Sequence, residues 1–271
     1  VRRRNLIPPN AFPYTTGTGL TYDSGNYGPS LDKALELADY ARFRQIQSER
    51  QPGEPLIGIG VATVVKASGG AGAMMSSIAR ISVEPTGKVK VFTEVSPHGQ
   101  GTETTFAQIA ADELGISIED VEVLHGDTDM LPHGQGTFAS RGLSVGGSAV
   151  HAGLQEARQK LAAIAAHILE CPAEDVAFRG GTVFNKRDPE QAMSFSELAS
   201  SAQRPELLPL GTDPGLEFQT EFTLPDNPFG FGAHVAVVEV DQETGELSFL
   251  RYAAVHDSGT VINPTLFEGQ V

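Results

Sequence analysis

The sequence predicts an α+β fold in which mixed sheets with β-hairpins carry long helices packed on one face. Two segments, 78–95 and 235–255, combine alternating apolar residues with a glycine-containing turn, as β-hairpins do. Two long segments between them repeat apolar residues with the period of an α-helix. Strands and helices do not alternate strictly along the chain, which favours α+β over a doubly wound parallel sheet.

The first part of the chain predicts one helix and then a series of strands. Ser30 is a suitable N-cap, and apolar residues recur at helical spacing after it, so we expect a helix from about 30 to 50. Residues 56–66 are rich in valine and isoleucine and predict a strand. The two hairpins turn at Gly87 and Gly245, where a positive φ is required.

Three helices are expected between the hairpins. The first covers about 102–114 and the second about 144–170, each with an apolar face. A short helix is expected after Ser194, because Ser194 and Glu197 have the spacing of a capping box.

Composition and charge exclude several functional classes. The 271 residues carry 34 acidic and 19 basic side chains, a net charge of -15. Nucleic acid and anionic membranes attract basic patches, so neither is expected as a partner. No apolar run approaches the roughly 20 residues of a membrane span. The single cysteine, Cys171, excludes an internal disulfide and a cysteine-held metal cluster, and it favours a reducing, cytoplasmic location.

The two ends of the chain suggest that it belongs to a longer protein. It begins at Val1 rather than at methionine, and it stops at Val271 without a tail or a closing helix. We therefore expect a piece of a larger chain.

A hexapeptide occurs twice, as 97–102 and again, letter for letter, as 132–137. Each copy precedes one of the two long predicted helices, and each helix is followed by Glu-Asp-Val, at 119–121 and 174–176. We interpret the two copies as related supersecondary units in which a glycine-rich loop leads into a helix. Chance convergence of the hexapeptide is the alternative.

The glycine-rich loops have the character of anion-binding sites. In the first, Gly99, Gln100 and Gly101 lead to Thr102 at a helix start, where backbone amides lack internal partners and the helix dipole is positive. The second loop offers the hydroxyls of Thr137, Ser140 and Ser144 around Ala139, together with the planar cation of Arg141. Two such loops suit a ligand with two phosphates, or with one phosphate and a polar ring. The alternative is a pair of ordinary capped helices.

The closing stretch adds amides, and the common catalytic motifs are missing from the sequence. Asn263 and Gln270 can donate and accept hydrogen bonds, as recognition of a heterocycle edge requires. No G-x-S-x-G elbow, H-E-x-x-H pair, Walker loop or G-x-G-x-x-G after a strand occurs. Histidines at metal-ligand spacing are also missing, so no protein-ligated metal is expected.

Taken together, these motifs resemble one known family. The segments 99–104, 126–129, 136–141 and 263–271, in this order and spacing, resemble the molybdenum hydroxylases, the xanthine dehydrogenase and aldehyde oxidase family. The resemblance extends over essentially the whole chain. It is strongest to bacterial large subunits of the carbon monoxide dehydrogenase type. It implies a molybdopterin-binding domain of the aldehyde oxidase and xanthine dehydrogenase type, with residues 1–95 ending a first molybdopterin-binding unit and 96–271 forming a second, truncated one.

The resemblance also implies the cofactor and the residues that bind it. The cofactor is molybdopterin with molybdenum, in bacterial members usually the cytosine dinucleotide, and its dithiolene sulfurs hold the metal in place of protein ligands. By motif position, Gln100 lies near the pterin and the metal's oxygen ligands, Ala139 contributes backbone near molybdenum, and Gln270 is a late pterin contact. The complete expected set of cofactor-binding residues is Gly99, Gln100, Gly101, Thr102, Thr137, Ala139, Ser140, Arg141, Ser144, Asn263 and Gln270.

The implied reaction is oxidative hydroxylation of a small molecule such as an aldehyde, an N-heterocycle or carbon monoxide, with oxygen from water. Electrons leave through Fe-S and FAD subunits of the same complex. The glutamate that acts as base lies, in this family, beyond Val271, so no catalytic residue is expected in this chain and the piece alone is expected to be inactive. The alternative is a non-catalytic ligand-binding module that keeps the fold without the cofactor.

Overall fold

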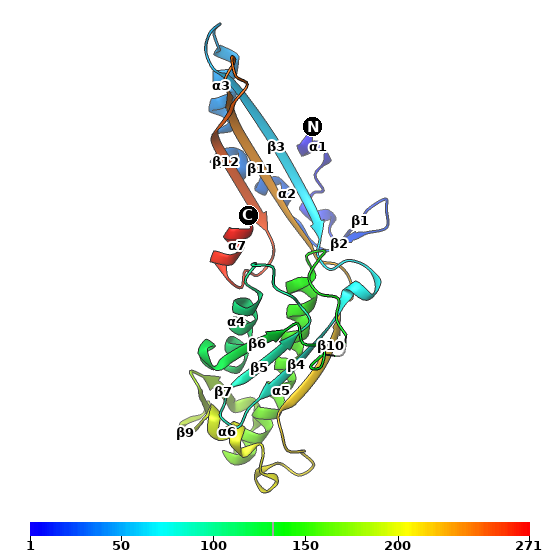
Figure 1. Cartoon of the computed structure of the whole chain (residues 1–271), viewed down its shortest axis with the longest axis vertical. Coiled ribbons are helices and arrows are strands. Elements are labelled where there is room, and N and C mark those ends of the chain that lie inside the picture. The colour runs from blue at the N-terminus through cyan, green and yellow to red at the C-terminus, as the bar shows by residue number, and fades with distance from the viewer. Residues whose placement is uncertain (132) are drawn as a thin grey trace. The chain divides into compact units, whose positions relative to one another are not determined.

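A computed structural model describes residues 1–131 and 133–271 (Figure 1). Pro132, which opens the second hexapeptide, lies outside the described residues. Contacts divide the chain into two compact units. Unit 1 comprises Val1–Ser68, Pro228–Val261 and Val271, and unit 2 comprises Gly69–Asn227 and Ile262–Gln270.

Unit 1 is built on a three-stranded antiparallel sheet of order β12-β11-β3. Its strands are β3 (Leu56–Ala67), β11 (Phe229–Val240) and β12 (Leu247–Asp257). Gly245 in the turn between β11 and β12 has a φ of 75°. The strand expected at 56–66 and the hairpin expected at 235–255 are both confirmed.

The helix expected from 30 to 50 is two helices, α2 (Tyr27–Leu37) and α3 (Tyr40–Glu49). Asp39 interrupts them with a left-handed conformation at φ 54°, which a short polar side chain tolerates better than most. Ser30 lies inside α2 and is not its N-cap. Buried residues of α2, among them Leu31 and Ala34, pack against Val235 in the sheet. The remaining elements before β3 are α1 (Arg2–Asn5), η1 (Pro9–Ala11), β1 (Tyr14–Thr15) and β2 (Thr21–Tyr22).

Unit 2 is built on a four-stranded mixed sheet of order β10-β4-β5-β6. Its strands are β4 (Ser76–Val83), β5 (Val89–Thr93), β6 (Val121–His125) and β10 (Glu217–Thr223). The expected hairpin is confirmed as β4 and β5, with Gly87 at φ 85° in its turn. Strands β5 and β6 are parallel, and α4 (Thr102–Leu114) connects them over one face of the sheet.

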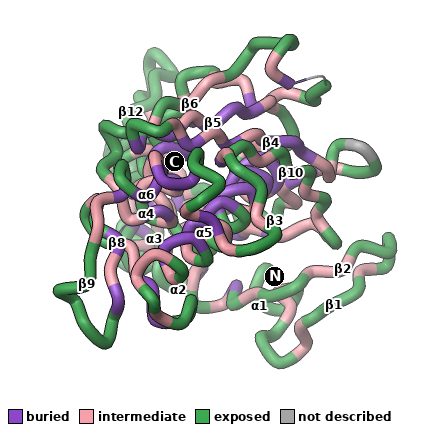
Figure 2. Tube along the Cα trace, turned by 90° about the horizontal axis from the view of Figure 1, so that it is seen from below, coloured by how far each residue is buried: buried purple, intermediate pink, exposed green. Residues whose placement is uncertain are grey.

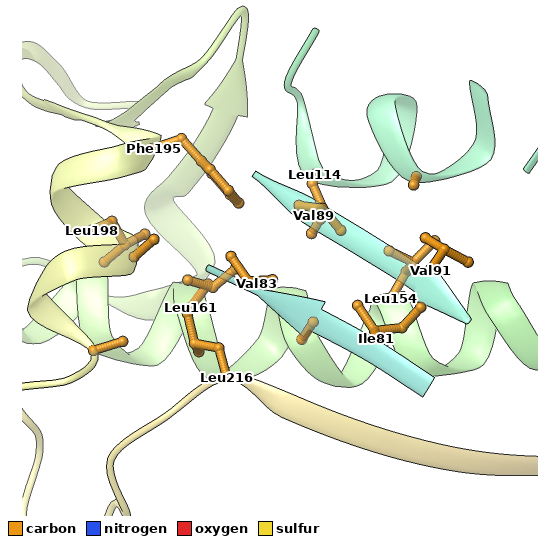
Figure 3. Close-up of a cluster of buried hydrophobic side chains, with 14 of the residues drawn as sticks. Ile81, Val83, Val89, Val91, Leu114, Leu154, Leu161, Phe195, Leu198 and Leu216 are labelled. Atoms are coloured by element: carbon orange, nitrogen blue, oxygen red, sulfur yellow. The ribbon is translucent and has the colours of Figure 1, made fainter. Parts of the chain in front are cut away.

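The long helix α5 (Ser148–Ile168) packs beside α4 on this sheet. Figure 3 shows Ile81 and Val91 of the sheet meeting Leu154 of α5 in the main hydrophobic core. Burial is densest around β4, β5 and α5 (Figure 2). The predicted α+β architecture with helices on one face is confirmed. The expected start of this helix at about 144 is replaced by a π-helical turn, η4 (Gly142–Gly147).

A small antiparallel sheet completes unit 2. It contains β7 (Val176–Arg179), β8 (Thr182–Asn185) and β9 (Asp188–Ser194) in that order. The next helix, α6 (Phe195–Ser201), begins with the expected capping box between Ser194 and Glu197. The remaining elements of unit 2 are η2 (Gly72–Met75), η3 (Ile118–Asp120), η5 (Ala173–Asp175), η6 (Pro205–Leu207) and α7 (Pro264–Gln270). Among the described residues, no helix combines the length and apolar character required to cross a bilayer.

The two compact units differ from the division at residue 95, which remains a prediction about molybdopterin-binding units. The hairpin of β4 and β5 belongs to the same sheet and core as α4 and α5, because its apolar face packs against those helices. The hairpin of β11 and β12 instead returns to pair with β3, more than 150 positions earlier in the chain. Long-range strand pairing, which local sequence patterns do not record, therefore sets the boundaries.

A histidine pair lies on the face of the unit 1 sheet opposite α2. The Nε2 atoms of His234 and His256 are 2.7 Å apart, and Nδ1 of His234 lies 3.0 Å from the hydroxyl of Tyr252. Partial burial, together with the neighbouring His234, lowers the pKa of His256. Protonating both rings would place two like charges at hydrogen-bond distance.

We expect the free energy of unfolding to decrease as the pH falls from 7.5 to 5.5. Because the pKa of His256 is lowered in the folded state, the unfolded state binds more protons once the pH falls through the ordinary value of about 6.5. Urea unfolding of wild type and His256→Gln at both pH values measures the effect. The variant should lose less stability than wild type, and an exposed-site control, His167→Gln, should behave like wild type. Equal losses in wild type and His256→Gln would contradict the assignment.

Truncating the core of unit 2 should be costly. Leu154 is fully buried between α5 and the sheet, so Leu154→Ala removes apolar contacts and leaves a cavity. We expect a loss of about 2–5 kcal/mol in the free energy of unfolding. Leu210→Ala is the matched control: Leu210 is fully exposed, so its change should stay within about 0.5 kcal/mol. Chemical denaturation of the three proteins makes the comparison.

Candidate functional site

The first glycine-rich loop of unit 2 leads directly into α4. Gly101 is the N-cap in a left-handed conformation, with a φ of 80°, and no side chain caps the helix. Gly99 has a φ of 93°, and nothing lies within 4 Å of the position where its Cβ would be. The first-turn amides at Thr102 and beyond therefore retain donors and a positive dipole end, which is the arrangement expected for an anion site.

Gln100 spans this loop with its amide side chain. Its Oε1 accepts a hydrogen bond from the backbone N–H of His98, and its Nε2 donates to Oγ1 of Thr102 at 3.0 Å. Thr102 is buried, whereas Gln100 is half-buried. In this structure Gln100 orders the loop, and its remaining amide N–H is the group that can be directed to a ligand.

The second glycine-rich loop lies against the first. Oγ1 of Thr137 donates to the carbonyl oxygen of Ser96 at 2.6 Å, so the residue that ends the second hexapeptide touches the residue just before the first. The two loops that were expected to face one common ligand are thus adjacent within unit 2.

A cavity of about 300 Å³ opens beside the second hexapeptide. It is lined by the end of β5 and the following residues, by the 126–128 turn and by the second hexapeptide, namely Thr93, Glu94, Ser96, Gly126, Asp127, Thr128, Leu131, His133, Gly134, Gln135 and Gly136. Thr137 adjoins this lining through its bond to Ser96. None of the predicted cofactor-binding residues is itself part of the lining.

Two consecutive non-glycine residues in the second loop have left-handed conformations. Ala139 has a φ of 50° and Ser140 a φ of 56°, and the carbonyl oxygen of Ala139 accepts a hydrogen bond from the N–H of Gly69 at 3.1 Å. Such conformations cost on the order of 1–3 kcal/mol each and persist where surrounding contacts impose them, frequently at functional sites. The turn includes Ala139, whose backbone the family resemblance predicts to lie near molybdenum.

The side chain of Arg141 is buried in this structure. The sequence suggested a cation offered to a ligand, but the Arg141 side chain is fully buried and its Nη2 lies 2.7 Å from Oε1 of Glu94. Its other bonds go to backbone carbonyls. A buried guanidinium with these hydrogen bonds stabilises the loop by pairing with its backbone carbonyls. Glu94 was missed by sequence reasoning, and its only signal was a lone carboxylate ending an apolar strand.

The remaining serine of the second loop lies at the start of η4. Oγ of Ser144 donates to the carbonyl oxygen of Ser140 at 3.3 Å. The same turn approaches the sheet closely at Gly146, where a Cβ would lie 2.2 Å from a methyl group of Val95. Backbone contact between η4 and Val95 therefore positions the start of α5 beside the first loop.

The closing segment reaches the same helix start. Nδ2 of Asn263 donates to Oε1 of Gln108 on α4 at 2.8 Å, and its Oδ1 accepts the N–H of Leu266 at 3.0 Å. Leu266 covers Gly101 so closely that a Cβ there would lie 2.5 Å from its side chain. Asn263 thus docks α7, while Gln270 is exposed at the end of this helix. The structure brings the first loop, the second loop and the Asn263 segment together around the N-terminus of α4.

Substituting Gly146 should destabilise unit 2. Gly146→Ala forces a methyl group into Val95, so we expect a loss of about 1–3 kcal/mol in unfolding free energy. Gly142→Ala is the matched control in the same turn, because its Cβ would meet Val95 at an ordinary 3.7 Å. Thermal unfolding compares them. Equal stability of the two variants would show that the close approach is not a constraint.

Comparison with known proteins places this geometry in a family. Residues 33–271 match the family model described as the molybdopterin cofactor-binding domain. The carbon monoxide dehydrogenase large chain of Hydrogenophaga pseudoflava is 36% identical over the whole chain, and the nicotine 6-hydroxylase large subunit of Paenarthrobacter nicotinovorans is 32% identical. The chain spans only 35% and 34% of the length of these two relatives.

Solved structures give the same result for the fold. Quinoline 2-oxidoreductase from Pseudomonas putida 86 superposes with a TM-score of 0.92 at 33% identity, over 99% of this chain and 35% of that one. Reconstituted CO dehydrogenase from Oligotropha carboxidovorans superposes with a TM-score of 0.90 at 33% identity, with the same coverage of both chains. The resemblance noted in the motifs is therefore confirmed, and the chain belongs to the molybdopterin cofactor-binding domain family of the molybdenum hydroxylases.

Proposed function

We propose that these residues form the cofactor-binding part of a molybdenum hydroxylase that oxidises a small molecule with oxygen derived from water. The observation that supports this most is the meeting of two glycine-rich loops through Thr137 and Ser96, beside the uncapped start of α4. Such a pair of loops suits a large anionic cofactor better than a single phosphate, because it offers amide donors from two directions.

The residues of unit 2 fit a dinucleotide form of molybdopterin. Amides at the start of α4 suit a pyrophosphate, and the open space at Gly99 permits close approach of the backbone. The hydroxyls of Thr102 and Ser140 supply further polar groups at the two loops. Gln100 and Gln270 carry amides suited to the polar edges of a pterin or a cytosine. The cytosine dinucleotide is the form we propose.

The bound cofactor would supply two-electron redox chemistry at molybdenum, which its own dithiolene sulfurs hold. Across residues 1–131 and 133–271, no group of three or more His, Cys, Asp or Glu side chains is placed to hold a metal ion. In this proposal the chain therefore contributes binding, orientation and backbone shape, with Gln100 and the Ala139–Ser140 turn nearest the reacting centre.

The remainder of the enzyme is proposed to lie in other chain segments and subunits. The relatives are about three times as long, so we place the glutamate base and the substrate pocket outside these 271 residues. Electrons would pass to Fe-S and FAD subunits of the same complex. The related proteins are described as acting on carbon monoxide, nicotine and quinoline, so we propose carbon monoxide, an N-heterocycle or an aldehyde as the substrate class. The 271-residue piece alone should show no turnover.

Elemental and nucleotide analysis of the full-length protein, purified from its own host, tests the proposal. We expect stoichiometric molybdenum and release of a cytidine nucleotide on acid treatment. Folded protein that contains neither would instead favour a non-catalytic binding module that keeps the fold without the cofactor.

Replacing Gln100 should weaken cofactor binding. Gln100→Ala removes its loop-ordering hydrogen bonds to His98 and Thr102, together with the amide directed to the ligand. We expect a loss of about 1–3 kcal/mol in cofactor affinity, measured as molybdenum per protein after gel filtration. Gln155→Ala, at an exposed position on α5, is the control and should keep full occupancy. Full molybdenum in Gln100→Ala would argue against its role.

A further inference from the structure

A buried ion pair lies directly beneath the second glycine-rich loop. Nη2 of Arg141 is 2.7 Å from Oε1 of Glu94, and the two side chains are 0% and 3% exposed. Removing both charges from water is costly, and a well-packed apolar pair of similar size is often at least as stable. Stability alone is therefore a weak reason for charges at this position.

Apart from the bond between the two side chains, the hydrogen bonds of the pair go to backbone groups. Nε of Arg141 donates to the carbonyl oxygen of Met74 at 3.0 Å, Nη1 to that of Gly136 at 2.7 Å, and Nη2 also to that of Ser76. The second carboxylate oxygen of Glu94 accepts the N–H of Gln135. The pair thus joins the start of β4 and the end of β5 to the second hexapeptide.

The same pair brackets the strained turn. Gly136 and Gln135 are held on one side of it, and on the other side Arg141 follows Ser140 directly and donates its own N–H to the carbonyl oxygen of Phe138 at 3.0 Å. Between these anchors Ala139 and Ser140 both have positive φ values. Two successive non-glycine residues keep this conformation only while their surroundings impose it.

We infer that Arg141 and Glu94 are positioning residues, which hold the Ala139–Ser140 backbone in the one conformation that the cofactor requires. This inference rests on the proposed function. The guanidinium does not touch the cofactor, because it is fully buried and donates its hydrogen bonds to acceptors inside the protein. Its planar fork is needed, because one cation must satisfy acceptors in several directions at once.

A double variant of the full-length enzyme separates positioning from simple stabilisation. Arg141→Met with Glu94→Gln removes both charges, so neither is left buried and unpaired, but it also removes the bonds to the loop carbonyls. We expect protein that still folds, with at least a tenfold fall in molybdenum per folded protein. A folded double variant that carries full molybdenum would overturn the inference.

Arg141→Lys provides the second measurement and covers the case in which the double variant does not fold. Lysine keeps the charge beside Glu94 but cannot reach all the carbonyls. We expect folded protein with reduced molybdenum content and, in the fraction that is loaded, a lower kcat with little change in KM. Full molybdenum together with wild-type kcat in this variant contradicts the inference.

The matched control is the partly exposed pair formed by Arg158 of α5 and Glu113 of α4. Arg158 and Glu113 form a partly exposed contact at 3.8 Å, away from both loops. Arg158→Met with Glu113→Gln should leave molybdenum content unchanged. Wild-type enzyme without molybdenum would overturn both the proposed function and this inference, whereas loaded wild type with an equally loaded double variant would overturn the inference alone.

Discussion

The burial of a charged pair beneath a loop is the constraint on which the arrangement of this site depends. Arg141 and Glu94 are removed from solvent, so each must satisfy its hydrogen-bonding groups inside the protein. They do so on backbone carbonyls and amides of η2 and of the second hexapeptide. Backbone groups of the loop, which would cost free energy if they were buried without partners, thereby form hydrogen bonds. The ion pair of Arg141 and Glu94 thus determines the conformation of the loop.

Close backbone approach then brings the other segments to the same place. Gly146 lies against Val95, and Gly101 lies beneath Leu266, at distances that any side chain would violate. The sheet and α5 supply a rigid base through their shared core (Figure 3). Binding groups on loops held by a rigid scaffold are a common arrangement, because loops can present backbone amides that strands and helices consume internally.

The function proposed for the chain is consistent with the groups that its side chains and backbone offer. A cofactor that brings its own metal ligands requires no cysteine or histidine cluster, and the protein need only bind its phosphates and orient its ring system. Unit 2 contains uncapped helix amides, hydroxyls and amide side chains close together, which are the groups such binding uses. Chemistry would then depend on parts of the complex beyond these residues.

Local sequence patterns were sufficient for the hairpins, for α4, for the capping box at Ser194 and for the family resemblance, because periodicity and turn chemistry act over a few residues. Tertiary structure decided the rest. Thr102 begins a helix, whereas its counterpart Thr137 in an identical hexapeptide turns its hydroxyl to Ser96. The role of Arg141 depends on Glu94, 47 positions away, and on a carbonyl 67 positions away. Burial of a charge is a property of the folded neighbourhood, so no local pattern could have revealed it.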